Sequence, residues 1–182
     1  MPNVSPVTKL YSTEDCKIAK LLTDVAGYAT YDSGIDVPGM RQVTMTPQIE
    51  SKQLRGDNRE LDADSTLVAV ELSFEHAKVS FEALPVFLGG TYTPGTTGYY
   101  DQAESNSLPY WAMGWRTPTN GVDAVGGDVH FHVTKAKITA YTLGTAFEDY
   151  QILSGTARGV YRLADDKLFR AIVNPTAAAI SI

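Results

Sequence analysis

Two long runs of alternating apolar and polar residues, 41–53 and 67–76, most constrain how this chain can fold. The apolar phase includes Val43 and Met45 in the first run and Phe74 in the second, while mostly polar side chains fill the other phase. Successive side chains of a β-strand point to opposite faces, so a period of two predicts two strands, each with one apolar and one polar face.

A polar, charged stretch, residues 54–66, separates the two runs. Hairpin loops normally close in two to five residues, and long connections without secondary structure are usually functional. We therefore expect an inter-strand arm that contacts another molecule. The alternative is a solvated, mobile loop, whose surface ion pairs would contribute little to stability.

The composition predicts one globular domain. The 182 residues fit a single unit, with residues 1–40 as an extended N-terminal arm and residues 41–182 as one β domain. Fifteen Lys and Arg against 21 Asp and Glu give a net charge of −6 and no basic cluster, which disfavours tight nucleic-acid binding. The single cysteine, Cys16, excludes an intramolecular disulfide. Without a signal-like or membrane-spanning apolar run, we expect neither secretion nor membrane insertion.

The segments around the two runs predict one helix and two short strands. Residues 78–88 carry an apolar stripe with Phe81 and Leu84 and end at Gly89, as helices often do at a glycine. Pro85 lacks a backbone donor, so this helix must be short or bent. Residues 28–31 and 108–116 are the strand candidates.

Residues 129–163 predict a second long hairpin. Apolar residues occupy odd positions up to Val133 and even positions from Ala136 onwards, so the phase slips near Thr134 and Lys135. One extra residue in a strand turns all later side chains to the opposite face, so the slip predicts a β-bulge. Residues 150–163 alternate again, and residues 169–173 predict a final strand.

His130 and His132 lie two residues apart and would share one strand face. Such a pair ligates a metal if a third ligand converges on it, and His76 is the only other histidine. The open alternative is therefore a small metal-dependent β-barrel or cupin-like enzyme. The favoured interpretation is that both histidines lie on a solvent-exposed strand face or at a subunit interface. We therefore expect no catalytic residue, metal or cofactor.

Several short motifs occur in a particular order along the chain. They are Glu50-Ser-x-x-Leu54-Arg-Gly-Asp-Asn58, Asp62-x-Asp64-Ser65-Thr66, Glu75-His76-Ala77-Lys78, Leu88-Gly89-Gly90, Gly127-Asp128-Val129-His130 and Glu148-Asp149-Tyr150. In this order they resemble the tail tube proteins, or major tail proteins, of long-tailed, siphovirus-type bacteriophages. The resemblance covers most of the chain beyond its first 30 residues.

The resemblance implies a mainly β fold, a tail-tube-type β-sandwich with one flanking α-helix. Subunits would form hexameric rings that stack into a hollow tube, with two long hairpins per subunit closing an inner barrel. The arm would reach a neighbouring subunit or ring through ion pairs and hydrogen bonds of Arg55, Asp57, Asn58, Arg59, Glu60, Asp62 and Asp64. The lumen would be lined by Gln42, Thr44, Thr46, Gln48, Glu50, Lys52, Glu71, Ser73, Glu75, Ser154, Thr156 and Arg158.

The same resemblance implies a location and a set of partners. The location is the tail of the virion, after synthesis in the cytoplasm of the bacterial host. The partners are other copies of the chain, a tape-measure protein, a tail terminator and distal tail or baseplate proteins, with no membrane. Double-stranded DNA would pass without sequence-specific binding, so a neutral or acidic lumen is expected. A ring-forming tail adaptor or terminator is the remaining alternative.

Overall fold

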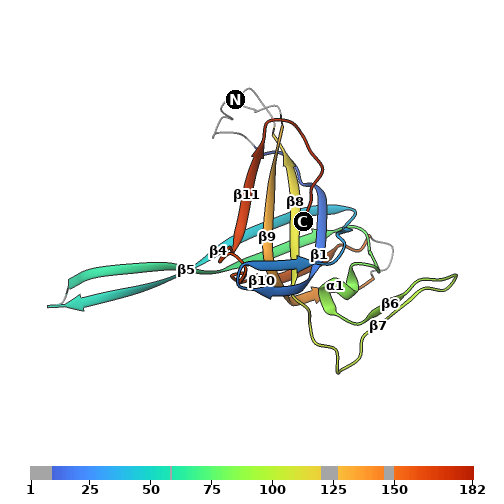
Figure 1. The fold of residues 1–182 in the computed structure, drawn as a ribbon, viewed down its shortest axis with the longest axis horizontal. Coiled ribbons are helices and arrows are strands. Elements are labelled where there is room, and N and C mark those ends of the chain that lie inside the picture. Colours follow the sequence, from blue (N-terminus) through green and yellow to red (C-terminus); the bar gives the residue numbers. More distant parts are fainter. Residues whose placement is uncertain (1–9, 58, 120–126, 146–149) are drawn as a thin grey trace.

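The computed structural model describes residues 10–57, 59–119, 127–145 and 150–182. Within them the fold is mainly β with one short helix, as the sequence predicts (Figure 1). The elements are β1 (Glu14–Val25), β2 (Tyr28–Tyr31), β3 (Ile35–Asp36), β4 (Met40–Gly56), β5 (Arg59–His76), α1 (Leu84–Leu88), β6 (Thr91–Thr93), β7 (Tyr99–Asp101), β8 (Trp111–Pro118), β9 (Asp128–Thr142), β10 (Leu153–Gly159) and β11 (Phe169–Asn174).

Nine of the strands form one antiparallel sheet. Its order is β2-β1-β8-β9-β10-β5-β4, with β3 pairing β1 and β11 pairing β9, while β6 and β7 form a separate ribbon. The sheet folds over itself, because Val43 and Met45 of β4 line the same cavity as Trp115 and Phe131 of β8 and β9. This places two layers of strands around one core, and β4 lies at an edge of the sheet.

Aromatic rings fill the core beneath α1. Phe74 of β5 stacks on Phe87 of α1 at a centroid distance of 5.2 Å and meets the edge of Trp111 at 6.3 Å. Tyr141 of β9 lies 5.6 Å from Phe87. The apolar phase of the second run, which includes Leu72 and Phe74, is therefore the face that builds the core.

Helix α1 is shorter than the predicted helix over 78–88. It spans only Leu84–Leu88, with Pro85 in its first turn and no side-chain cap at Ala83. Proline lacks the N–H that a helix interior needs, but this group has no helical partner in the first turn, so the helix begins around Pro85.

The N-terminal segment differs from the predicted extended arm over residues 1–40. Residues 14–25 form β1, which pairs with β8 inside the sheet. Ile18 and Ala19 are consecutive and both are buried, so this strand is covered on both faces at its middle. A strand buried on both faces lacks the two-residue period, and this explains why the sequence pattern did not reveal it.

The predicted bulge in the second hairpin is confirmed. Trp111 pairs with Ala136 and Met113 pairs with Val133, so two residues of β9, Thr134 and Lys135, face one residue of β8. A second shift follows, because Thr156 pairs with Ala140 and Ala157 with Ile138. The two bulges turn both Ile138 and Tyr141 toward the core.

Gly155 of β10 lies directly beneath the Phe74 ring. A Cβ atom at this position would approach Phe74 Cε2 to 2.7 Å. We expect Gly155→Ala to reduce the free energy of unfolding by about 1–3 kcal/mol, because the surrounding rings leave little space for adjustment. Urea denaturation measures this.

The matched control is Gly34→Ala, since an added Cβ there meets nothing within 4 Å. Its effect is expected to stay within about 0.5 kcal/mol. Equal destabilisation by the two substitutions would contradict the close packing at Gly155.

Candidate assembly surfaces

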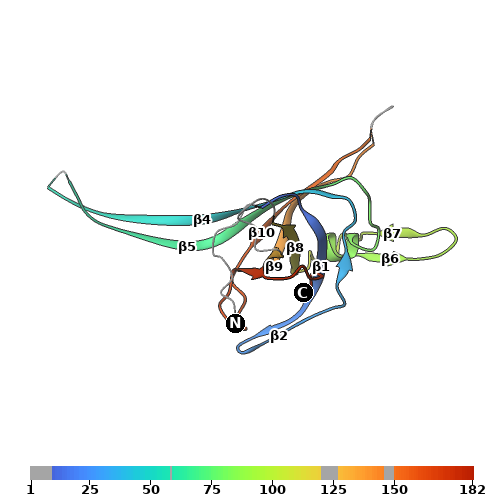
Figure 2. The same cartoon turned by 90° about the horizontal axis from the view of Figure 1, so that it is seen from above.

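The predicted arm over residues 54–66 is a continuation of a hairpin. Strands β4 and β5 stay paired to the tip, where Arg55 pairs with Glu60 and Gly56 with Arg59. Asp57 in the turn adopts a left-handed backbone conformation with φ of 51°, which tight hairpin turns require. Figure 2 shows the resulting ribbon extending far beyond the rest of the fold.

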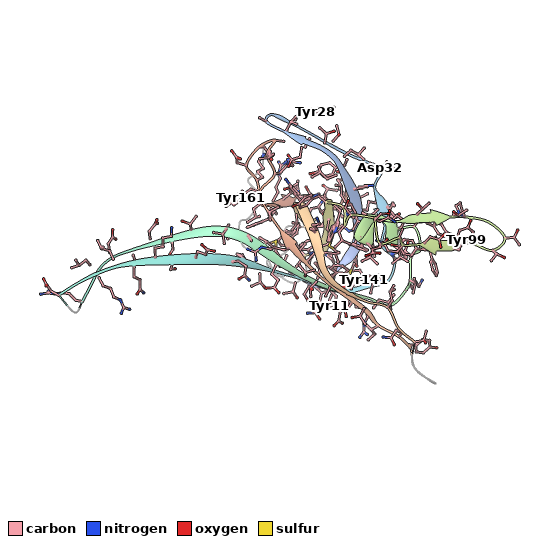
Figure 3. The ribbon with its side chains drawn as sticks, turned by 90° about the horizontal axis from the view of Figure 1, so that it is seen from below. Tyr11, Tyr28, Asp32, Tyr99, Tyr141 and Tyr161 are labelled. Carbon is pink, nitrogen blue, oxygen red and sulfur yellow. The ribbon has the colours of Figure 1, made fainter. Side chains whose placement is uncertain are left out.

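The distal half of the hairpin has no apolar cover from the described residues of its own chain. Ile49, Leu54 and Leu61 are 65%, 62% and 61% exposed. The polar contacts are local: Ser51 Oγ lies 2.8 Å from Ser65 Oγ, and the Arg55 guanidinium donates to Gln53 Oε1 at 2.9 Å. The side chains stand free of the remaining structure in Figure 3.

The predicted arm residues are placed along this ribbon. Arg55, Asp57, Arg59, Asp62 and Asp64 are exposed. Within the described part of the chain none of these five forms a salt bridge, whereas Asn58 and the Glu60 side chain lie outside the described residues. Their charges therefore remain open to a partner.

Nine of the twelve predicted lumen residues share one polar face. Cross-strand pairing on β4, β5 and β10 sets them in three rows. The rows are Gln42, Glu75 and Ser154; Thr44, Ser73 and Thr156; and Thr46, Glu71 and Arg158. Opposite them, the other face carries the core, so the alternation predicted from the sequence produces one continuous polar surface.

The other three predicted lumen residues lie further along β4. Gln48 joins the edge of the polar face, where its amide donates to Glu71 Oε2 at 3.3 Å. Past this point the pairing register shifts, and Glu50 and Lys52 pair with Thr66 and Asp64 on the projecting ribbon. These two residues are therefore separated from the rows above.

Strand β9 adds residues to the polar face that the sequence pattern left open. Lys137 pairs with Arg158, and Thr139 Oγ1 lies 2.9 Å from Thr156 Oγ1. Lys135 lies on the same side as Lys137, since both amino groups stand over the Tyr110 ring, at 4.9 and 5.1 Å from its centroid, and Lys135 also forms an ion pair with Asp24 at 2.7 Å. The phase slip in the sequence indicates that the side chains change from one face of the strand to the other near this point. The positions of the bulges are needed to determine which face each lysine occupies.

The three histidines do not converge. His76 is buried and bonds through Nδ1 to the Lys78 carbonyl at 2.6 Å and through Nε2 to the Tyr141 hydroxyl at 2.7 Å. The rings of His130 and His132 lie 6.2 Å apart. Among the described residues, no group of three or more His, Cys, Asp or Glu is placed to hold a metal ion.

Asp128, at the start of β9, fastens the C-terminal segment to the sheet. Its carboxylate accepts hydrogen bonds from the Ala178 backbone N–H at 2.9 Å and the Asn174 amide at 2.8 Å, and it lies 3.2 Å from His130 Nε2. Burial alone would raise the pKa of Asp128, but these donors favour the charged form and the pKa falls below its ordinary value.

A lowered native pKa makes the contribution of Asp128 depend on pH. The stabilisation is complete above the unfolded pKa of about 4 and is lost as pH falls through the native value. We expect Asp128→Asn to reduce the free energy of unfolding at pH 7 by about 1–3 kcal/mol. The difference between the two proteins should shrink below about pH 4. Denaturation at a series of pH values measures it.

Asp36→Asn serves as the control, because the Asp36 side chain is 73% exposed and its contact with Lys17 is long, at 3.6 Å. This substitution should change the free energy of unfolding by no more than about 0.5 kcal/mol at every pH measured. A difference between wild type and Asp128→Asn that is the same at pH 3 and pH 7 would contradict the role given to the charge.

Comparison with protein-family models and with curated proteins finds no match. Among solved structures, a chain from the cryo-EM structure of the anti-feeding prophage (AFP) baseplate, 6-fold symmetrised, is similar over 92% of this chain and 96% of that chain. The sequence identity is 10% and the TM-score is 0.39. This similarity is too distant to carry an argument. No helix within the described ranges has the length and apolarity to cross a membrane.

Proposed function

We propose that this protein is a structural subunit of a phage-type tail tube. It polymerises as stacked hexameric rings that surround a tape-measure protein and form a conduit for DNA. It would lie in the tail of the virion, bounded by terminator and distal tail or baseplate proteins. The proposal joins the resemblance in sequence to the geometry of the hairpin and of the polar face.

The observation that carries the proposal is the unsupported half of the β4–β5 hairpin. An isolated two-stranded ribbon is only marginally stable in water, because it has no layer on which to bury its apolar side chains. Leu54 and Leu61 on this ribbon are nonetheless exposed. A second copy of the chain would cover these side chains and supply partners for Arg55 and Arg59.

The free edge of the sheet at β4 also supports assembly into a ring. Strand β4 leaves a row of backbone donors and acceptors along one side, and such an edge promotes aggregation unless it is covered. Pairing with the next subunit in a closed ring would satisfy these groups and continue the polar face around a lumen. Pro47, which lacks a backbone donor, lies in this strand, and proline is tolerated at an edge.

Assembly is the first property to test. We expect negative-stain electron microscopy of the purified protein, across a range of concentrations, to show hexameric rings or striated hollow tubes. Sedimentation gives the corresponding mass. Single rings that never stack would favour the adaptor or terminator alternative, and a monomer at every concentration, even with tail initiator proteins present, would overturn the proposal.

Reversing the charges at the hairpin tip tests the stacking contact directly. Arg55→Glu with Arg59→Glu should block tube formation, because both cations would be replaced by anions in the contact. The monomer should keep its stability, since both side chains are exposed and outside the core. Microscopy and thermal denaturation measure the two effects.

The matched control is Arg55→Lys with Arg59→Lys, which keeps the charge at each position. This variant is expected to form tubes at a protein concentration close to that required by the wild type. Normal tubes from the Glu variant would show that the hairpin tip is not the stacking element.

A further inference from the structure

A cavity of about 260 Å³ lies between the C-terminal segment and strands β8, β9 and β11. Five basic side chains line it: His130, His132, Arg162, Lys167 and Arg170. Among the described residues no Asp or Glu lines it. The polar face and the hairpin make no use of this cavity.

Hydrogen bonds hold Arg162, one of the basic residues that line the cavity, in place. Arg162 donates to both oxygens of Asp165, at 2.8 and 2.6 Å, and also to the Tyr31 hydroxyl at 2.8 Å. Tyr31 in turn donates to the Thr134 carbonyl at 2.7 Å. These contacts fix Arg162 against β9 before any ligand arrives, which reduces the cost of ordering it on binding.

Two groups at the cavity lack partners among the residues that the structure describes. The exposed Arg170 guanidinium forms no hydrogen bond or ion pair with the described residues, and Arg170 is the cross-strand neighbour of His132 on β9. His132 Nε2 is buried from water and also has no hydrogen-bond partner there. Water can solvate the exposed Arg170, whereas the buried His132 Nε2 costs free energy while it has no partner, so a ligand that supplies one is favoured there.

The charge of the side chains that line the cavity indicates which kind of ligand would fit. The side chains of Arg162, Lys167 and Arg170 share one nearby side-chain carboxylate, that of Asp165, so positive side-chain charge is in excess. Arginine binds phosphate oxygens through paired, charge-assisted hydrogen bonds. A tetrahedral oxyanion of the phosphate class would complement this excess and present more acceptor oxygens to Arg170, Lys167 and His132 than a carboxylate does.

We infer that this cavity is a binding site for a tetrahedral oxyanion of the phosphate class, held by Arg170, Lys167 and His132 Nε2. The residues that line the site belong neither to the hairpin nor to the polar face, so binding can be measured separately from assembly. Its donors come from β9, β11 and the segment that joins β10 to β11.

Isothermal titration with inorganic phosphate, against sodium chloride at equal ionic strength, tests the site. We expect saturable binding to the wild-type protein and a change in the chemical shift of the His132 ring. Arg170→Gln should weaken binding by about tenfold or more, the loss typical of one charge-assisted hydrogen bond. Arg41→Gln removes an exposed cation from β4 and is the matched control, with no expected change.

Direct binding is the readout because phosphate also stabilises folded proteins through general exclusion from their surfaces. A second variant, His132→Gln, should weaken binding without altering the fold of the sheet, as judged by circular dichroism. Absence of saturable binding would overturn the inference. Equal affinity for acetate, or equal losses in Arg170→Gln and Arg41→Gln, would overturn it as well.

Discussion

The cross-strand register of β4, β5, β10 and β9 is the constraint on which the rest of the molecule depends. It gives the sheet one apolar face, where Phe74 packs against Gly155, and one polar face, where Ser73 pairs with Thr156. A shift of one residue would exchange the two faces, so the core and the polar surface are specified by the same pairing. The bulges in β9 preserve this arrangement as the strand passes from β11 to β10, because each returns an apolar residue to the core.

Alternation made the strands around 41–53 and 67–76 and the bulge near Thr134 predictable from the sequence. The hairpin tip was not, because polar residues occur in both phases there and the isolated Leu54 and Leu61 do not mark an apolar face. Strand β1 was missed for the opposite reason, since Ile18 and Ala19 are buried on opposite faces. Alternating patterns reveal strands with one buried and one solvent-exposed face. They fail for strands in which both faces are buried or both are exposed.

Buried carboxylates fasten distant segments in a way that no local pattern reveals. Asp24 of β1 pairs with Lys135 and accepts hydrogen bonds from the backbone N–H groups of Leu163 and Ala164. Asp128 does the same for the C-terminal segment through Ala178. Each anchor joins residues 46 or more positions apart, so neither the anchors nor the basic cavity could be predicted from spacing. Once such a carboxylate is buried, its donors must stay in place or the charge loses its compensation.

The polar face also bears on the sign of the lumen in the proposed tube. Its central rows carry Glu71 and Glu75 on β5, balanced by Arg158 on β10 and Lys137 on β9. A lining of this composition would be close to neutral, so an acidic lumen would require charge from outside these rows. A neutral lining has a physical advantage, because each cation that neutralises a phosphate adds affinity, and a strongly basic wall would retain DNA. A surface that carries charges of both signs would stay hydrated without attracting phosphate strongly, which suits a conduit better than a binding groove.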